Sequence, residues 1–219
     1  MKPTENLKLK VCGLTQLTQI QELISLNTDF LGFIFYEKSP RYVLHHLSLK
    51  EIAEIPHFGK VGVFVNESIK AIVEITTESQ LDIIQLHGNE NEKFILQLRQ
   101  ILGNNIKIIK VIRIGNQSFD ELQKTINQQP STVNYLLFDT DSKAFGGTGK
   151  TFDWQILNEI EIPIPYFLSG GISLENIHQL STINHQPLAL DINSKFETEP
   201  GIKNLEKIKN FTQIVKKIY

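Results

Sequence analysis

The sequence has 219 residues, of which 41% are hydrophobic and 21% charged, and its formal net charge is −2 at pH 7. These values are ordinary for a soluble globular protein, and the length suits one large domain with a sizeable core. The charge is close to neutral and no Lys- or Arg-rich tract is present, which excludes the electrostatic footprint of a nucleic-acid-binding protein. We therefore expect a small-molecule ligand.

The single cysteine, Cys12, cannot form an internal disulfide, which suits a reducing compartment. The N-terminal stretch MKPTENLKLKV lacks the apolar region of a signal peptide. No stretch approaches the ~18 consecutive apolar residues of a membrane span. The sequence therefore predicts a cytoplasmic protein with no membrane partner.

Eight short runs rich in β-branched and aromatic residues recur along the chain, each followed by a polar break and a stretch with helical spacing. Their repeat distance of roughly 20 to 30 residues is what one strand, one crossover helix and two loops require. In chain order the predicted strands are LKLKVCG (7–13), FLGFIF (30–35), KVGVFV (60–65), DIIQLHG (82–88), IKIIKVIRI (106–114), NYLLFDT (134–140), PYFLSGG (165–171) and PLALDINS (187–194).

The intervening segments predict helices over 15–26, 49–55, 68–78, 91–102, 119–128, 153–159, 173–180 and 206–218. Four of them open on residues that can cap a first turn, namely Thr15, Ser48, Ser68 and Ser173. Strict alternation of strand and helix implies parallel strands with right-handed crossovers. Eight such units predict an α/β fold, a single (β/α)8 TIM barrel, and no linker divides residues 1–219 into separate domains.

Alternation within the strands indicates which side chains enter the barrel. In LKLKVCG, Lys8, Lys10 and Cys12 share the face opposite to the leucines, because strand side chains alternate. Helices cover the outside of such a barrel, so Cys12 is expected to point into its mouth, where the active sites of these barrels lie. Gln85 and His87 share one face of their strand, as do Asp191 and Asn193 of theirs.

The segment AFGGTGKT, residues 144–151, has nearly the spacing of a phosphate-binding P-loop. Alanine stands at its first glycine position, and Pro163 and Pro165 allow at most about two helical turns after it. An ATP site is therefore disfavoured. Two alternatives remain: a surface loop whose glycines only make turns, or a lid over the barrel mouth next to the strand that ends at Asp139.

Seven segments in order, KVCGLT, GFIFYEKSPRYV, VGVFVN, QLHGNE, FDT with GGTGKTFDW, FLSGGI, and DINSKFETEPGIKN, together resemble phosphoribosylanthranilate isomerase. The resemblance extends from about residue 9 to residue 209. It implies an Amadori rearrangement in tryptophan biosynthesis, which converts N-(5-phosphoribosyl)anthranilate into 1-(2-carboxyphenylamino)-1-deoxyribulose 5-phosphate. It implies neither a cofactor nor a metal.

The resemblance also implies roles for individual residues. Cys12 matches the general base, whose thiolate Lys10 could favour, and Asp139 matches the general acid. Arg41 matches the residue that pairs with the anthranilate carboxylate, and His87 is expected to line the same mouth. The phosphate is expected between two backbone segments, Gly170 with Gly171 and Asn193 with Ser194.

One position departs from the family pattern, because Lys195 stands where most relatives have glycine. A β-carbon there requires either an ordinary φ or strain, and the lysine ammonium could help to neutralise the phosphate. The following segment, ETEPGIKN, is expected to form the short extra helix of the phosphate site.

Three other interpretations stay open on the sequence: the sister barrel indole-glycerol-phosphate synthase, a barrel that binds phosphate without catalysis, and a nucleotide-binding module. The oligomeric state is expected to be monomeric, because no long apolar stripe is left over.

Overall fold

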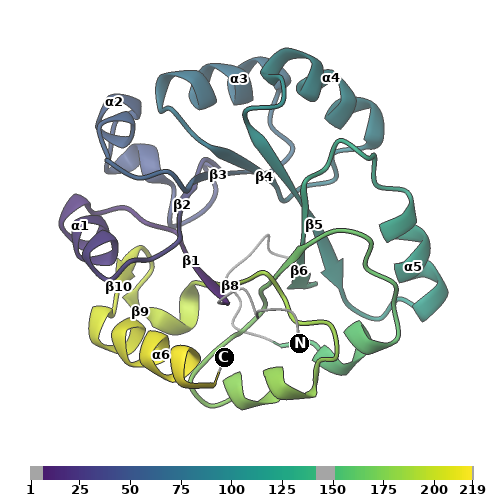
Figure 1. The fold of residues 1–219 in the computed structure, drawn as a ribbon. Coiled ribbons are helices and arrows are strands. Elements are labelled where there is room, and N and C mark those ends of the chain that lie inside the picture. Colours follow the sequence, from purple (N-terminus) through teal and green to yellow (C-terminus); the bar gives the residue numbers. More distant parts are fainter. Residues whose placement is uncertain (1–6, 142–150, 219) are drawn as a thin grey trace.

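The computed structural model describes residues 7–141 and 151–218, and these form a closed barrel of eight parallel strands surrounded by helices (Figure 1). Each strand pairs with its neighbour in sequence, and β1 closes the ring against β8 with Lys10 opposite Asp191. The predicted TIM barrel is confirmed. Its strands are β1 (Lys8–Cys12), β2 (Phe30–Ile34), β3 (Lys60–Phe64), β4 (Ile83–Leu86), β5 (Lys107–Ile114), β6 (Tyr135–Thr140), β7 (Tyr166–Leu168) and β8 (Ala189–Ile192).

Within the described residues, six α-helices and four short 3-10 helices follow or connect the strands. The α-helices are α1 (Leu17–Ser25), α2 (Leu49–Ala53), α3 (Ile69–Glu78), α4 (Glu92–Leu102), α5 (Phe119–Asn127) and α6 (Leu205–Ile218). The 3-10 helices are η1 (Val43–His45), η2 (Trp154–Asn158), η3 (Ile177–Thr182) and η4 (Ser194–Phe196). No helix among the described residues is long and apolar enough to cross a membrane.

Two of the four predicted caps are confirmed. Ser48 accepts a hydrogen bond from the Glu51 N–H at the start of α2, and Ser68 accepts one from the Ala71 N–H at the start of α3. Thr15 is not a cap, because its hydroxyl donates to the Gly201 carbonyl instead. Ser173 is not a cap of η3 either, since η3 begins only at Ile177.

Three predicted helical segments differ from the structure. The segments at 153–159 and 173–180 form turns and the 3-10 helices η2 and η3, not α-helices. The first segment is short and is followed by Pro163 and Pro165, which end any helix. The second is eight residues long and contains Ser173, Asn176 and His178, which are weaker helix formers than Ala or Leu. The segment ETEPGIKN forms two antiparallel strands, β9 (Glu197–Glu199) and β10 (Ile202–Lys203), so the predicted extra helix there was wrong.

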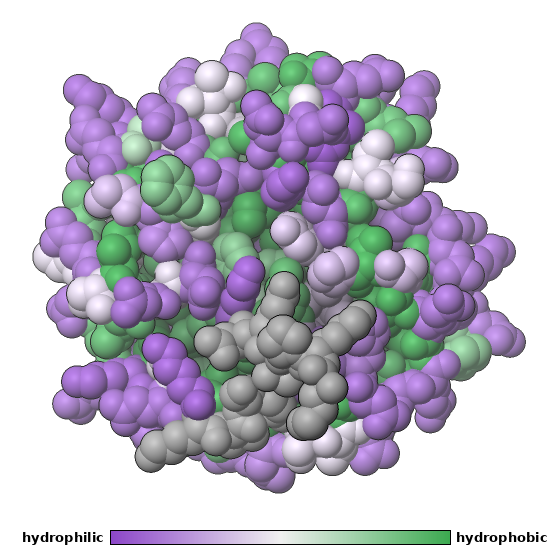
Figure 2. Space-filling view, in the orientation of Figure 1, coloured by the Kyte–Doolittle hydropathy of each residue, from purple (hydrophilic) through white to green (hydrophobic). Residues whose placement is uncertain are grey.

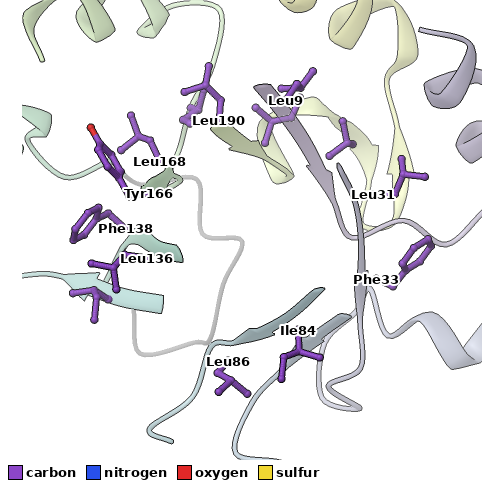
Figure 3. Packing of buried hydrophobic residues seen from close by; sticks show 14 of the residues in the cluster. Leu9, Leu31, Phe33, Ile84, Leu86, Leu136, Phe138, Tyr166, Leu168 and Leu190 are labelled. Atoms are coloured by element: carbon purple, nitrogen blue, oxygen red, sulfur yellow. The ribbon is translucent and has the colours of Figure 1, made fainter. Parts of the chain in front are cut away.

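The face of the molecule seen in Figure 1 is mostly hydrophilic in the space-filling view, with hydrophobic side chains visible between the polar ones (Figure 2). Most of the buried apolar side chains lie beneath this surface, in the layer between the strands and the helices. Leu31, Phe33, Leu86 and Phe138 illustrate that layer, since they point away from the barrel centre (Figure 3). Burying this apolar area, at roughly 25 cal/mol per Å², is the main stabilising contribution to the fold.

A second, smaller apolar cluster fills the inside of the barrel. Its members are Val61, Ile83, Ile109, Val111, Leu137, Phe167 and Ala189. They alternate along their strands with the residues that face the helices, as the pleat of a strand requires. The interior is therefore a packed core, and the polar residues that share its parity collect around it.

Candidate active site

The eight residues predicted from the sequence for the site all lie at or just after the C-terminal ends of strands. Cys12 is the last residue of β1, Asp139 is the second-last residue of β6, and His87 directly follows β4. The remaining five are Arg41 in the segment after β2, Gly170 and Gly171 after β7, and Asn193 and Ser194 after β8. The carboxyl ends of parallel strands meet at one end of a barrel, so all eight belong to the same face.

Cys12 is buried beside a glycine of the neighbouring strand. A β-carbon built on Gly32 would lie 2.9 Å from the Cys12 sulfur, so the missing side chain makes room for the thiol. Lys10, two residues earlier on the same inward face, donates from Nζ to Asp191 Oδ2 at 2.9 Å. The thiol therefore stands at the end of β1 over a completely buried ion pair.

The electrostatics of Cys12 oppose an ionised resting state. Burial raises the pKa of the Cys12 thiol, and the positive charges of Lys10 and Lys203 offset this only in part. Burial alone would lower the pKa of the Lys10 ammonium, but the charge of Asp191 and that of a Cys12 thiolate outweigh it and the pKa lies above its ordinary value. Lys10 is therefore firmly cationic, and Cys12 is held mainly as a neutral thiol.

Asp139 lies on the other side of the barrel beside His87. The His87 Nε2 atom is 3.4 Å from Asp139 Oδ2, and His87 Nδ1 is 3.3 Å from the Gln85 amide nitrogen. If Gln85 donates to Nδ1, the proton of a neutral His87 ring must sit on Nε2, where it faces the carboxyl group of Asp139. The backbone N–H of Thr140 also donates to Asp139 Oδ1 at 2.8 Å. Two groups thus fix the orientation of this carboxyl.

The glycine pair after β7 lies directly against Asp139. Gly170 has φ +85°, and a β-carbon there would come within 2.4 Å of the Thr140 hydroxyl and 3.3 Å of Asp139 Oδ1. Gly171 has φ +68°. Both values lie in the left-handed region that glycine adopts without steric cost. The backbone between β7 and η3 therefore packs against Asp139 in a way that no other residue at position 170 would permit.

Arg41 is buried and is paired with a carboxylate that the sequence did not single out. Its Nε lies 3.0 and 2.9 Å from the two oxygens of Glu197, and its Nη2 lies 2.6 Å from Glu197 Oε2. Lys203 donates from Nζ to Glu197 Oε1 at 2.6 Å and to Asn193 Oδ1 at 2.8 Å. Arg41, Glu197 and Lys203 form one cluster, called the ion cluster below.

Glu197 and Lys203 were missed because ETEPGIKN was interpreted as a helix. In the structure they face each other across β9 and β10, where Lys203 is the register partner of Glu197. Burial by itself would raise the pKa of the Glu197 carboxyl, but hydrogen bonds and charges from Arg41 and Lys203 outweigh it and the pKa lies below its ordinary value. The carboxylate is therefore ionised and belongs to the site.

The loop after β8, which the sequence predicts to be one side of the phosphate site, leads into η4. Asn193 and Ser194 lie at the start of η4, and Lys195 is exposed within it. Lys195 is not among the described residues with positive φ, so the β-carbon is accommodated by an ordinary backbone conformation. Of the two alternatives for Lys195, an ordinary φ or strain, the structure shows the first.

The remaining expectations concern the segment AFGGTGKT and a metal site. Residues 144–150 of AFGGTGKT, the predicted lid, lie outside the described residues. The segment just after them forms η2, a 3-10 helix, where a P-loop needs an α-helix. Within residues 7–141 and 151–218, no group of three or more His, Cys, Asp or Glu is arranged to hold a metal ion.

The family model and the related sequences that match this chain all indicate the same family. Residues 9–214 match the family model described as N-(5'phosphoribosyl)anthranilate (PRA) isomerase. A protein of Parabacteroides distasonis named N-(5'-phosphoribosyl)anthranilate isomerase is 38% identical over 208 residues, which cover 94% of this chain and 91% of the relative. A protein of the same name from Nostoc punctiforme is 40% identical over 205 residues, covering 92% and 95%.

Solved structures agree with the fold. Phosphoribosyl anthranilate isomerase from Thermus thermophilus superposes with a TM-score of 0.80 at 23% identity, covering 97% of this chain and 100% of that one. An isomerase in complex with reduced 1-(o-carboxyphenylamino)-1-deoxyribulose 5-phosphate gives 0.74 at 28% identity, covering 96% and 99%. Monomers generated from the dimeric enzyme of Thermotoga maritima give 0.75 at 28% identity, with the same coverage.

Proposed function

Because the chain belongs to the N-(5'-phosphoribosyl)anthranilate isomerase family of tryptophan biosynthesis, we propose that it catalyses the Amadori rearrangement with Asp139 as general acid and Cys12 as general base. The observation that carries the assignment is the placement of these two groups at the ends of β6 and β1, in one barrel mouth. The substrate is N-(5-phosphoribosyl)anthranilate and the product is 1-(2-carboxyphenylamino)-1-deoxyribulose 5-phosphate.

In the first step Asp139 donates its proton to the ring oxygen of the ribose. The bond between C1' and that oxygen breaks, the lone pair of the anthranilate nitrogen forms a double bond to C1', and the ring opens to a cationic Schiff base. The hydrogen bond from Thr140 N–H and the contact with His87 Nε2 hold the carboxyl in place and stabilise the carboxylate that the step leaves behind.

In the second step Cys12 removes the proton from C2'. The electrons of the C2'–H bond form a C1'–C2' double bond and neutralise the nitrogen, and the resulting enol amine tautomerises to the ketone. A neutral thiol is a weak base, and burial keeps Cys12 in that form at rest. The base is therefore the thiolate, which forms when Cys12 releases its proton to solvent and becomes a thiol again when it takes the C2' proton. The charges of Lys10 and Lys203 favour this thiolate against the effect of burial.

Substrate binding uses the remaining residues of the mouth. We propose that Arg41 pairs with the anthranilate carboxylate, and that the phosphate lies between the Gly170–Gly171 backbone and the Asn193–Ser194 backbone. Asp191 Oδ1 and Gln85 Oε1 are buried and have no hydrogen-bond partner among the described groups.

The test is turnover of phosphoribosylanthranilate, monitored by its fluorescence, by the wild type, Cys12→Ser and Asp139→Asn. Both variants should lose about 10²- to 10⁴-fold in kcat, the usual contribution of a positioned acid or base. Asp141→Asn, an exposed neighbour of the same charge, is the matched control and should keep the wild-type rate. Near-wild-type rates in both site variants would refute the acid and base roles, whereas an inactive wild type would refute the function itself.

We further propose that residues 1–219 act as one barrel domain, because β1 and β8 close the ring and the hairpin near the C-terminus is bonded to the loop after β1. A cytoplasmic location and a monomer are proposed on the composition and on the small number of exposed large hydrophobic side chains among the described residues: Phe58, Leu96, Ile101 and Phe119. One relative is dimeric by its description. Sedimentation of the purified protein at several concentrations would decide between the two states.

A further inference from the structure

We infer that Glu197 is a positioning residue of the isomerase, which holds one edge of the Arg41 guanidinium so that the opposite edge is presented to the substrate carboxylate. The inference rests on the proposed function and specifies how its carboxylate site is built. Among the described residues, no hydrogen bond joins Glu197 to Cys12 or Asp139.

The contacts of Arg41 are one-sided. A guanidinium has two edges that can pair with a carboxylate, one formed by Nε and Nη2 and the other by Nη1 and Nη2. Glu197 occupies the first edge with three contacts of 2.6 to 3.0 Å. Among the described residues, none accepts a hydrogen bond from Nη1. A second carboxylate can therefore bind Arg41 at the free edge without displacing Glu197.

The Arg41 side chain is also fixed along its length. A β-carbon built on Gly13 would lie 2.7 Å from Arg41 Cδ and 2.9 Å from Asn193 Oδ1. The arginine thus lies across the backbone that directly follows Cys12 and beside the loop after β8. Its free edge is held at the barrel mouth, next to the proposed base.

Glu197 is itself immobilised, as a positioning residue must be. Its side chain is only 4% exposed, and its oxygens accept hydrogen bonds from Lys203 Nζ at 2.6 Å and from the Gly201 N–H at 3.1 Å, in addition to those from Arg41. The hairpin that carries it is bonded to the loop after β1 through the Thr15 hydroxyl, at 2.7 Å from the Gly201 carbonyl. The carboxylate is therefore a rigid anchor for Arg41.

Charge balance explains why the cluster contains Lys203. Arg41 and Lys203 each carry one positive charge and Glu197 carries one negative charge. The positive charge of Lys203 balances the negative charge of Glu197, so the positive charge of Arg41 remains to attract the substrate carboxylate. The ion cluster is therefore buried with a surplus of one positive charge, which matches the single carboxylate of the anthranilate ring.

The experiment compares two ligands that differ only in that carboxylate: reduced 1-(o-carboxyphenylamino)-1-deoxyribulose 5-phosphate and its analogue with an unsubstituted phenyl ring. Their dissociation constants are measured by calorimetry for the wild type, Glu197→Gln, Glu197→Asp, Arg41→Ala and the control Glu199→Gln. Glu199 lies two residues further along the same strand, is exposed, and undergoes the same loss of charge.

Glu197→Gln should weaken the carboxylate ligand on the order of 10- to 100-fold, the range for a charge-assisted hydrogen bond, and should leave the phenyl analogue within about 2-fold. Glu197→Asp should recover part of the loss, and the double variant with Arg41→Ala should bind no more weakly than Arg41→Ala alone. In turnover the expected change is in KM rather than kcat. Glu199→Gln should match the wild type in every measurement.

Other outcomes overturn the inference. Tighter binding of the carboxylate ligand by Glu197→Gln would make Glu197 a competitor for Arg41, and equal losses for both ligands would make its role structural. The phenyl analogue, measured on the same preparation, shows whether the variant is folded. Wild-type turnover in the same assay separates these results from a failure of the proposed function, since the inference can fail while the isomerase activity stands.

Discussion

Removal of the Lys10 ammonium is the most informative perturbation of stability, because Lys10 and Asp191 join the first and last strands of the barrel. Their charged atoms are 2.9 Å apart and their side chains are 0% and 6% exposed. At that distance and an effective dielectric constant of about 20, the attraction is about 6 kcal/mol. Breaking a buried pair by removing one partner costs about 3–5 kcal/mol in measured cases.

We therefore expect Lys10→Met to lower the free energy of unfolding by about 3–5 kcal/mol, or Tm by about 6–20 °C for a chain of this size. The assay is urea unfolding monitored by the fluorescence of Trp154, the single and buried tryptophan. The matched control is Lys50→Met, which breaks an exposed pair with Glu54 at 4.0 Å and should change stability by less than about 0.5 kcal/mol.

The double variant Lys10→Met with Asp191→Asn tests the cause. It removes the uncompensated charge, so it should recover most of the loss, and the coupling of the two substitutions should exceed about 1 kcal/mol. If the two losses were additive, or if Lys10→Met were as mild as Lys50→Met, the reasoning from a buried ion pair would be refuted.

The pH dependence gives an independent check with a defined sign. In the wild type the pKa of Lys10 is raised, so the stabilisation is fully present below the ordinary lysine value of about 10.4 and is lost as the pH rises through the folded-state pKa. In the wild type burial raises the pKa of the Asp191 carboxyl although the charge and hydrogen bond of Lys10 oppose it, and Lys10→Met removes that opposition. A carboxyl whose folded-state pKa is raised lowers stability once it ionises, so the penalty of Lys10→Met should be absent below about 3.9 and should grow as the pH rises above that value.

Three further predictions concern the site. Gly170→Ala should destabilise the protein by about 1–3 kcal/mol because of its positive φ, and it should also lower kcat because it displaces Asp139. In the control Gly103→Ala a β-carbon meets nothing within 4 Å, so only stability should change. Equal kcat values in the two variants would contradict the contact between Gly170 and Asp139. Because burial raises the pKa of Cys12, kcat/KM should still be increasing with pH above the ordinary cysteine value of about 8.5, and a flat profile would argue against a thiol base. Lys195→Gly should weaken phosphate binding in competition assays with inorganic phosphate, and a marked gain in affinity would exclude a compensating role for the lysine charge.

The strands and the polar face of the barrel could be predicted because period-two patterns are local. The alternation in LKLKVCG places Lys10 and Cys12 inside, and the structure confirms both as buried on the inner face. The Lys10 pairing with Asp191 follows once β1 and β8 are adjacent, but that adjacency is a property of ring closure. The local sequence pattern thus predicts which side chains face the barrel interior, whereas the order of the strands in the closed barrel determines which of these side chains are in contact.

The ion cluster could not be predicted in the same way. Arg41 and Glu197 are separated by 156 positions along the chain, and no pattern in either segment indicates the pair. The hairpin could have been indicated by the dipeptide Pro200–Gly201, which is typical of a turn, and Gly201 has φ +88°. Recognition of that turn would have placed Lys203 opposite Glu197 and indicated a paired charge near the mouth.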